Sequence, residues 1–128
     1  MVKLSVQPLK KVGSVEFGMK REKVRELLGE AKEFKKSKFS KTTTDDFGYC
    51  HVFYDMNDKC EAIEIFEEVE VEIDGRCIFP VSINEAKSLI NDLLEEEDSL
   101  ISKSQSVGIY APSGKMESIL FGNKNYYE

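Results

Sequence analysis

The sequence has few of the residues from which active sites are built. It contains one histidine, His51, and three cysteines, Cys50, Cys60 and Cys77, with no Cys-x-x-Cys pair among them. A zinc site needs about four ligands at suitable spacings, and an unpaired cysteine is normally a small buried residue. The Gly-rich spacing that holds phosphate before a helix is also missing. We therefore expect no enzymatic activity, no cofactor and no bound metal.

Long apolar runs are absent as well. No segment approaches the ~18 residues that a membrane-spanning helix requires. The first eight residues have neither a long apolar core nor a small-residue cleavage site, so we expect no secretory signal. The cysteines are odd in number and lack a pairing pattern, which indicates a reducing compartment, and we expect a cytoplasmic protein.

What is present is an ordinary globular composition with an uneven charge. Of the 128 residues, 41% are hydrophobic and 33% charged, and the length fits one domain over residues 1–128. The net charge is −6: residues 1–64 carry 13 Lys and Arg against 11 Asp and Glu, whereas residues 65–128 carry 5 against 13. Such a chain disfavours nucleic acid and favours a basic partner. The Lys-rich residues 32–41, which include Phe34 and Phe39, are a weaker signal for single-stranded nucleic acid.

Hydrophobic periodicity predicts the elements of the first half. Residues 20–28 form a helix, because apolar residues recur there at helical spacing and Gly29 follows as a stop signal. Residues 3–9 are predicted to form an edge strand, and residues 12–18 a short strand or bend. Residues 32–46 are polar, and we expect a long loop or an irregular strand there.

The clearest hairpin pairs residues 49–55 with residues 59–66 around an Asn-Asp turn. The expected opposite pairs are Val52–Ile63, Tyr54–Glu61 and His51–Glu64. Because successive side chains of a strand point to opposite faces, this hairpin separates His51 from Tyr54. It thereby breaks up the only cluster that could have supplied acid–base catalysis.

The second half begins with a strand and a helix. Residues 68–73 alternate strictly between glutamate and β-branched residues, which is typical of a half-buried strand with a wet acidic face. Ser82 and Glu85 have the spacing of a capping box and predict a helix over residues 82–93. We expect that helix to fray at residues 95–98, where carboxylates oppose the helix dipole. A last hairpin is predicted over residues 106–110 and 115–121.

The two halves of the sequence resemble each other. Four residues of the first hairpin recur 56 positions later: Tyr54, Lys59, Glu61 and Ile63 match Tyr110, Lys115, Glu117 and Ile119. A helix precedes each hairpin, so we interpret residues 12–66 and 76–122 as two units of strand, helix and hairpin. Two such units joined edge to edge give an α+β two-layer sandwich. One antiparallel sheet then carries both helices on one face and leaves the other face open.

One segment resembles a known group of proteins. Between Val15 and Gly29 the chain has a small residue and Met, a short charged stretch, Val and then Leu-Leu-Gly, and a hairpin with an Ile-rich second strand follows. These motifs resemble the beta-lactamase-inhibitor-protein-like group, which includes the SmpA/OmlA outer-membrane assembly lipoproteins. The resemblance covers residues 17–66 and, more loosely, 79–121. It implies a protein-binding module, sometimes in tandem, whose open sheet face contacts its partner.

In size, acidity and lack of catalytic equipment the chain is also similar to the cytoplasmic immunity proteins of bacterial polymorphic toxin systems. We therefore expect a non-enzymatic inhibitor or immunity-type protein that occludes a basic partner protein through an acidic sheet face. The expected contact residues are Glu64, Glu68, Glu70, Glu72, His51 and Phe53. Two alternatives remain open. One is a ligand-binding or enzymatic domain with a pocket between helices and sheet, and the other is a module that dimerises through the strand over residues 3–9.

Overall fold

The structure, a computed structural model, describes residues 2–66 and 68–127. In this part of the chain two helices, α1 (Arg21–Leu28) and α2 (Ile83–Leu89), lie among thirteen strands. The strands of the first half are β1 (Val2–Gln7), β2 (Lys11–Val12), β3 (Val15–Glu16), β4 (Lys32–Phe34), β5 (Thr44–Asp46), β6 (Cys50–Tyr54) and β7 (Cys60–Phe66). Those of the second half are β8 (Val69–Ile73), β9 (Arg76–Phe79), β10 (Leu94–Glu96), β11 (Ser99–Ser102), β12 (Val107–Tyr110) and β13 (Ser118–Gly122). The fold is α+β, as the sequence predicts.

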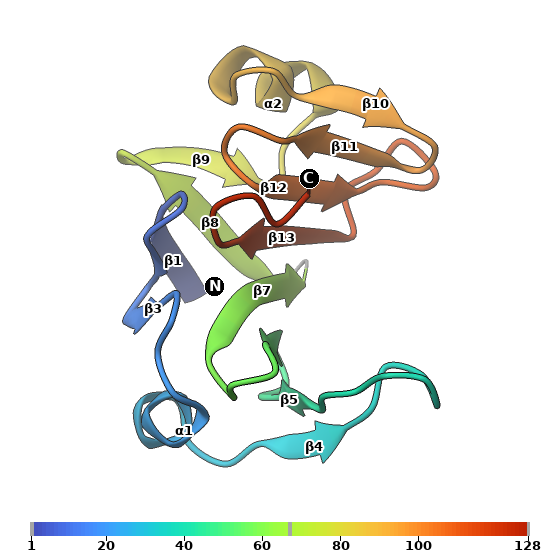
Figure 1. The fold of residues 1–128 in the computed structure, drawn as a ribbon. Coiled ribbons are helices and arrows are strands. Elements are labelled where there is room, and N and C mark those ends of the chain that lie inside the picture. The colour runs from blue at the N-terminus through green and yellow to red at the C-terminus, as the bar shows by residue number, and fades with distance from the viewer. Residues whose placement is uncertain (1, 67, 128) are drawn as a thin grey trace.

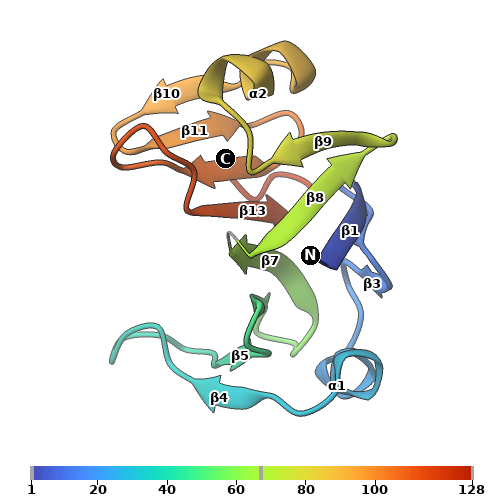
Figure 2. The ribbon, with the colours of Figure 1, turned by 180° about the vertical axis from the view of Figure 1, so that it is seen from behind.

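The strands form two sheets that pack against each other. An eight-stranded antiparallel sheet has the order β10-β11-β12-β13-β7-β6-β5-β4, and a five-stranded sheet has the order β3-β2-β1-β8-β9. The smaller sheet lies behind the larger one in Figure 1 and in front of it in Figure 2. The helices lie at the two ends of the molecule, α1 beside β4 and β5 and α2 beside β10 and β11. Both helices and the small sheet thus cover the same face of the eight-stranded sheet.

One core lies between these layers and is formed by the inward side chains of both sheets. Val52, Ile63 and Ile109 point inward from the eight-stranded sheet, and Val6 and Val71 point toward them from the five-stranded sheet. All of them belong to a single cluster of buried residues, which also contains Val24 of α1 and Ala86 of α2. We call the side of the eight-stranded sheet that points away from this core the outer face.

The predicted local elements are largely present. The helix over residues 20–28 is α1, and the expected capping box exists, since the Ser82 side chain accepts a hydrogen bond from the Glu85 amide at 3.2 Å. Both hairpins form, and Val52–Ile63 and His51–Glu64 are opposite pairs. Tyr54 is instead opposite Cys60, because a bulge leaves Glu61 without a partner in β6.

Several longer-range expectations are wrong. The strand over residues 3–9 is not an edge, because β1 pairs with β2 on one side and, in parallel, with β8 on the other. Residues 94–96 form β10 instead of a frayed helix end. The expectation of a long loop or an irregular strand over residues 32–46 is confirmed in part, because a loop lies between the short strands β4 and β5 at the two ends of this segment. The second helix ends at Leu89, although Ile90 and Leu93 remain buried. The apolar pattern over residues 82–93 therefore predicts correctly which side chains are buried, but it predicts a longer helix than the one that forms.

The order of elements is the same in both halves of the chain. Each half runs from the small sheet through a helix into four strands of the large sheet, and the two halves meet where β7 pairs with β13. Ile63 and Ile119 both point inward, but Tyr54 is buried whereas Tyr110 lies on the outer face, so the tyrosine match is coincidental. A duplication origin for residues 12–66 and 76–122 remains a prediction.

The buried carboxylate of Asp45 connects α1 to the eight-stranded sheet. Asp45 of β5 is fully buried, and Arg25 contacts it through two nitrogens at 2.8 and 2.6 Å. Arg21 donates to Asp45 at 3.2 Å, and the Tyr54 hydroxyl donates to it at 2.9 Å. The Arg21 guanidinium also lies 4.0 Å above the centre of the Tyr54 ring. Burial alone would raise the pKa of Asp45, but the hydrogen bonds from Arg25 and Tyr54 and the two positive charges lower it.

We expect Asp45→Asn to lower the free energy of unfolding by about 3–5 kcal/mol at pH 7, because it removes the buried negative charge that Arg21 and Arg25 share. Arg21 then keeps only the more exposed carboxylates of Asp58, at 3.0 Å, and Glu33, at 3.8 Å. The lowered pKa means that the contribution of Asp45 is present above the pKa of an unfolded aspartate, about 3.9, and is lost as the pH falls through the folded value. The difference between wild type and variant should therefore shrink in acid. Urea denaturation at pH 7 and pH 3 measures it.

The matched control is Glu33→Gln, which removes an exposed carboxylate that also contacts Arg25, at 2.9 Å. An exposed ion pair contributes at most about 1 kcal/mol. Equal losses in the two variants would contradict the assignment of Asp45 as the principal link between α1 and the sheet.

Candidate functional site

The outer face carries a band of half-exposed apolar side chains. The strand register places Ile101, Gly108, Leu120, Glu64 and His51 side by side across β11, β12, β13, β7 and β6. Tyr110 and Leu94, at the β10 side of the band, are 44% and 67% exposed. This face is turned toward the viewer in Figure 1 and has no second layer of helix or strand over it. Side chains of this kind are typical of the centre of protein–protein interfaces.

The end of the chain lies across part of this face. After β13 the Asn123 amide donates to the Glu61 carbonyl at 2.9 Å, and the two following tyrosines pack edge to face with ring centres 5.2 Å apart. Tyr126 lies over Gly122, and Tyr127 lies over Gly108. A Cβ atom on either glycine would collide with the tyrosine above it, so the missing side chains make room for the rings.

Beside this tail the outer face is hollowed. The hollow, which we call the anchor pocket, has a volume of about 230 Å³. Its floor and walls include Gly108, Leu120, Ile101, Tyr110 and Tyr127, with the carboxylate of Glu64 at one side. The Ser118 hydroxyl donates to Glu64 Oε2 at 2.8 Å and holds that side chain in place. The pocket thus combines apolar and aromatic walls with one fixed negative charge.

Burial raises the pKa of both tail tyrosines, and the negative charge of Glu64 adds to the effect. Both phenols are therefore neutral at physiological pH. Each provides an uncharged aromatic ring together with a hydroxyl group that can donate a hydrogen bond.

The β4 side of the outer face has a different character. His51 lies between Phe34 and Phe66, with ring centres 5.1 and 4.8 Å away, and its Nε2 is 3.6 Å from an Asp46 oxygen. The connection between β4 and β5 brings the Lys36 ammonium to 4.1 Å from the centre of the Phe53 ring. This half of the face is basic and aromatic rather than acidic.

The structure separates the contact residues that the sequence predicts. Glu64, His51 and Phe53 lie together on the outer face of the eight-stranded sheet. Glu70 and Glu72 belong to β8 in the other sheet, where they face Lys3 and Ser5 of β1, and Glu68 is exposed just before that strand. The two sheets bury their apolar faces against each other, so their outward faces point in opposite directions. The six residues therefore do not form one surface.

Sequence reasoning missed the residues that build the anchor pocket. The last hairpin was recognised, but its outward side chains were not distinguished from its core. One signal was available: Gly108 stands inside a predicted strand and Gly122 directly follows one, and glycine in a strand often marks the close approach of another group. The aromatic residues at positions 126 and 127 follow soon afterwards and are that group.

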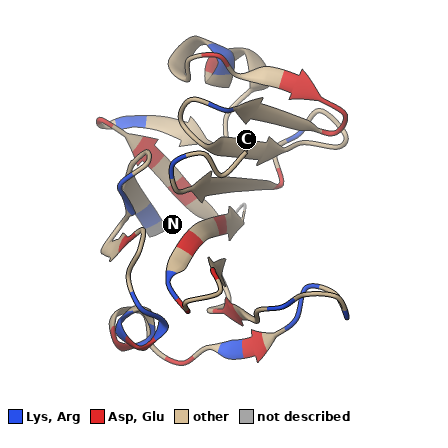
Figure 3. Ribbon diagram, in the orientation of Figure 1, with Lys and Arg blue, Asp and Glu red and all other residues tan. Residues whose placement is uncertain are grey.

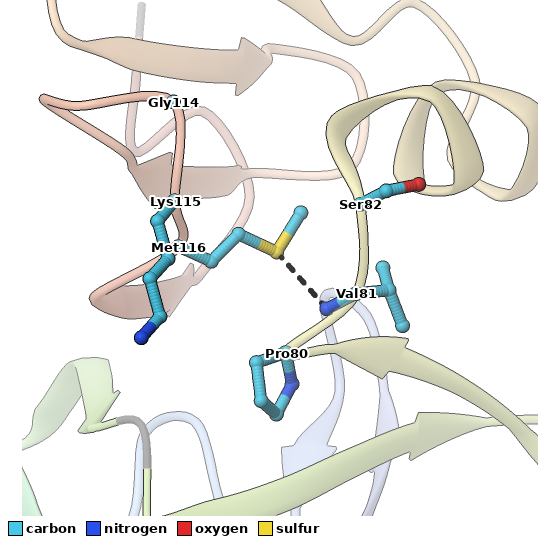
Figure 4. A pocket seen from close by; sticks show the side chains of 6 residues that line it. All are labelled: Pro80, Val81, Ser82, Gly114, Lys115 and Met116. Atoms are coloured by element: carbon cyan, nitrogen blue, oxygen red, sulfur yellow. Dashed lines mark hydrogen bonds between the residues drawn. The ribbon is translucent and has the colours of Figure 1, made fainter.

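A second cavity lies between the start of α2 and the turn before β13. It measures about 470 Å³, and Figure 4 shows its lining. The Val81 amide donates to the Met116 sulfur at 3.4 Å, whereas the side chains of Ser82 and Lys115 point away from that contact. The Ser82 hydroxyl already caps α2. No set of converging polar groups remains here to hold a ligand.

No family model, no curated protein and no solved structure matches this chain. The resemblances drawn from the sequence therefore remain predictions. Among residues 2–66 and 68–127 no three His, Cys, Asp or Glu side chains come together in a way that could hold a metal ion. Neither helix in the same residues has the length and apolar character needed to cross a membrane.

The packing of the tail on glycine gives a test. Gly108→Ala should lower the free energy of unfolding by about 1–3 kcal/mol, because the new methyl group collides with the Tyr127 ring. In a Tyr127→Ala background the same substitution should cost nothing or stabilise the strand, since alanine restricts the unfolded chain more than glycine. Urea denaturation of the four proteins measures the coupling. Equal effects of Gly108→Ala in both backgrounds would show that Tyr127 does not lie on Gly108 in solution.

Proposed function

We propose that this protein is a non-enzymatic, inhibitor- or immunity-type binding module that covers a basic partner protein with the outer face of its eight-stranded sheet. The observation that carries the proposal is the band of half-exposed aromatic and aliphatic side chains around the Glu64 carboxylate. Interfaces are typically held by a few such anchors near their centre, and occlusion of an active surface needs no chemistry from the protein that covers it.

The distribution of charge supports a basic partner. Residues 95–98 are four consecutive acidic residues, all exposed, at the β10 edge of this face. Within residues 2–66 and 68–127 Glu95 alone of the four forms an ion pair, with Lys87 at 3.1 Å. Figure 3 shows acidic residues at the β10 edge and basic residues along the connection between β4 and β5. A partner with a basic patch would be attracted to the β10 half and repelled from the opposite end. Such polarity speeds encounter and fixes orientation.

The buried core leaves little room for a ligand. The pocket between Leu4, Leu28 and Cys50 has a volume of about 40 Å³, far below the roughly 300–1,000 Å³ of typical small-molecule sites. A hollow between Leu89 of α2 and Ile73 and Ile78 of the small sheet, at about 320 Å³, is at the lower end of that range. The dimerising alternative is less favoured, because β1 pairs with β8 through residues 2–5 and with β2 through Val6 and Gln7.

The test compares how wild type and matched variants capture a partner from extracts of the cells in which the protein occurs. The cytoplasmic fraction is the source, because the cysteine content predicts a cytoplasmic protein. Leu94→Arg and Tyr110→Ala each alter an exposed residue of the outer face, and Glu70→Lys with Glu72→Lys alters the opposite sheet. We expect a basic protein that wild type captures to be retained by the Glu70/Glu72 variant. Its recovery should fall about tenfold or more with either outer-face variant, as for loss of an interface anchor.

The captured protein must then bind purified wild type in a defined complex by size-exclusion chromatography, and circular dichroism must report the same folded content for all variants. Loss of capture only in the Glu70/Glu72 variant would contradict the proposal and assign the contact to the acidic row of β8. Capture that no variant changes would contradict it as well.

A further inference from the structure

The anchor pocket has the chemistry of a site for one long basic side chain. We propose that it receives an arginine or lysine side chain of the partner protein, with the cationic head on the Glu64 carboxylate and the alkyl stem along Leu120 and Ile101. This inference rests on the proposed function, because it names what the partner presents to the outer face.

The carboxylate of Glu64 is available for such a contact. Its Oε2 accepts the Ser118 hydroxyl at 2.8 Å, and within the described part of the chain no Lys, Arg or His nitrogen lies within 4.0 Å of it. Glu64 is half-buried in the middle of a central strand. A cation that reaches it is partly withdrawn from water, where opposite charges attract more strongly than at an open surface.

The walls suit the rest of the side chain. Tyr110 and Tyr127 line the pocket on one side, and the face of a tyrosine ring attracts a guanidinium or ammonium group. Leu120 and Ile101 provide an apolar surface for a methylene stem, which long basic side chains bury while the charged head remains hydrated or paired. A neutral apolar anchor would leave Glu64 desolvated without a counter-charge, which makes it the poorer occupant.

The volume of the anchor pocket favours a single side chain over a free small molecule as its occupant. At about 230 Å³ the pocket is smaller than the roughly 300–1,000 Å³ of typical small-molecule sites. It is also open on the side away from the sheet, where the partner's backbone would lie. The exposed carboxylates of residues 95–98 border the same half of the face and add to its attraction for a basic surface.

The first experiment titrates the labelled protein with N-acetyl-arginine methylamide and follows the amide signals by NMR spectroscopy. The neutral citrulline analogue has the same shape and serves as the ligand control. We expect saturable shifts at Gly108, Leu120 and Tyr127 with the arginine compound, and a Kd at least about tenfold weaker with citrulline.

The protein variants use the same logic. Glu64→Gln preserves the shape of the side chain and its bond to Ser118 but removes the charge, and it should weaken the arginine Kd at least about tenfold. Glu70→Gln removes an equally half-buried carboxylate from the other sheet and should leave the Kd unchanged. Equal binding of arginine and citrulline, or an unchanged Kd in Glu64→Gln, would overturn the inference.

Partner capture distinguishes the two proposals. Loss of the partner in Glu64→Gln together with Tyr110→Ala and Leu94→Arg supports both. If Glu64→Gln retains the partner while Leu94→Arg loses it, the basic anchor is wrong and the binding face stands. If none of these variants loses the partner, the binding face itself is wrong. Arginine binding without any partner that depends on Glu64 would make the pocket a site for a free cationic ligand and would overturn the assignment to a protein side chain.

Discussion

The pairing of β7 with β13 is the contact on which the rest of the molecule depends. It joins the two halves of the chain through five residue pairs, from Ser118–Phe66 to Gly122–Ala62, and makes one eight-stranded sheet out of two four-stranded ones. Without it the last strand of each half would keep its hairpin partner but have one unpaired edge. The same contact sets Glu64 beside Leu120 and Ser118, so the anchor pocket belongs to neither half alone.

A second constraint is the shared core. Because both sheets bury one face against the other, every outward side chain is committed to one of two surfaces that point in opposite directions. The acidic alternation of β8 and the aromatic band of the large sheet are therefore separate features. The first has Lys3 of the neighbouring strand opposite Glu70, whereas the second has an open pocket. The charge pattern of a single strand does not indicate whether its outward side chains lie beside a pocket, so the sequence could not distinguish the β8 row from the band on the outer face.

The sequence predicts the local elements of this structure better than the contacts between distant segments. The capping box at Ser82, the hairpin register at Val52–Ile63 and the α+β class follow from local rules and are present. The parallel pairing of β1 with β8 could not be predicted, because nothing in the sequences of two distant strands indicates that they pair with each other. The network around Asp45 was missed because its partners come from α1, β4 and β6, and polar residues 32–46 resembled a solvated loop. Of the outer face, Glu64, His51 and Phe53 are predicted contact residues, and of these only Glu64 lines the anchor pocket, whose other walls the sequence did not indicate.

The position of β13 near the end of the chain has a consequence for synthesis. Until that strand has been made, β7 has an unpaired edge, and in its sequence Ala62-Ile63-Glu64-Ile65-Phe66 four of five residues are apolar and two are β-branched. Exposed edges of this kind join with one another and aggregate. Glu64 is the single charge inside this five-residue stretch, and a charge at such a place opposes edge-to-edge association. We therefore expect the carboxylate of Glu64 also to oppose aggregation of the nascent chain before β13 has been made.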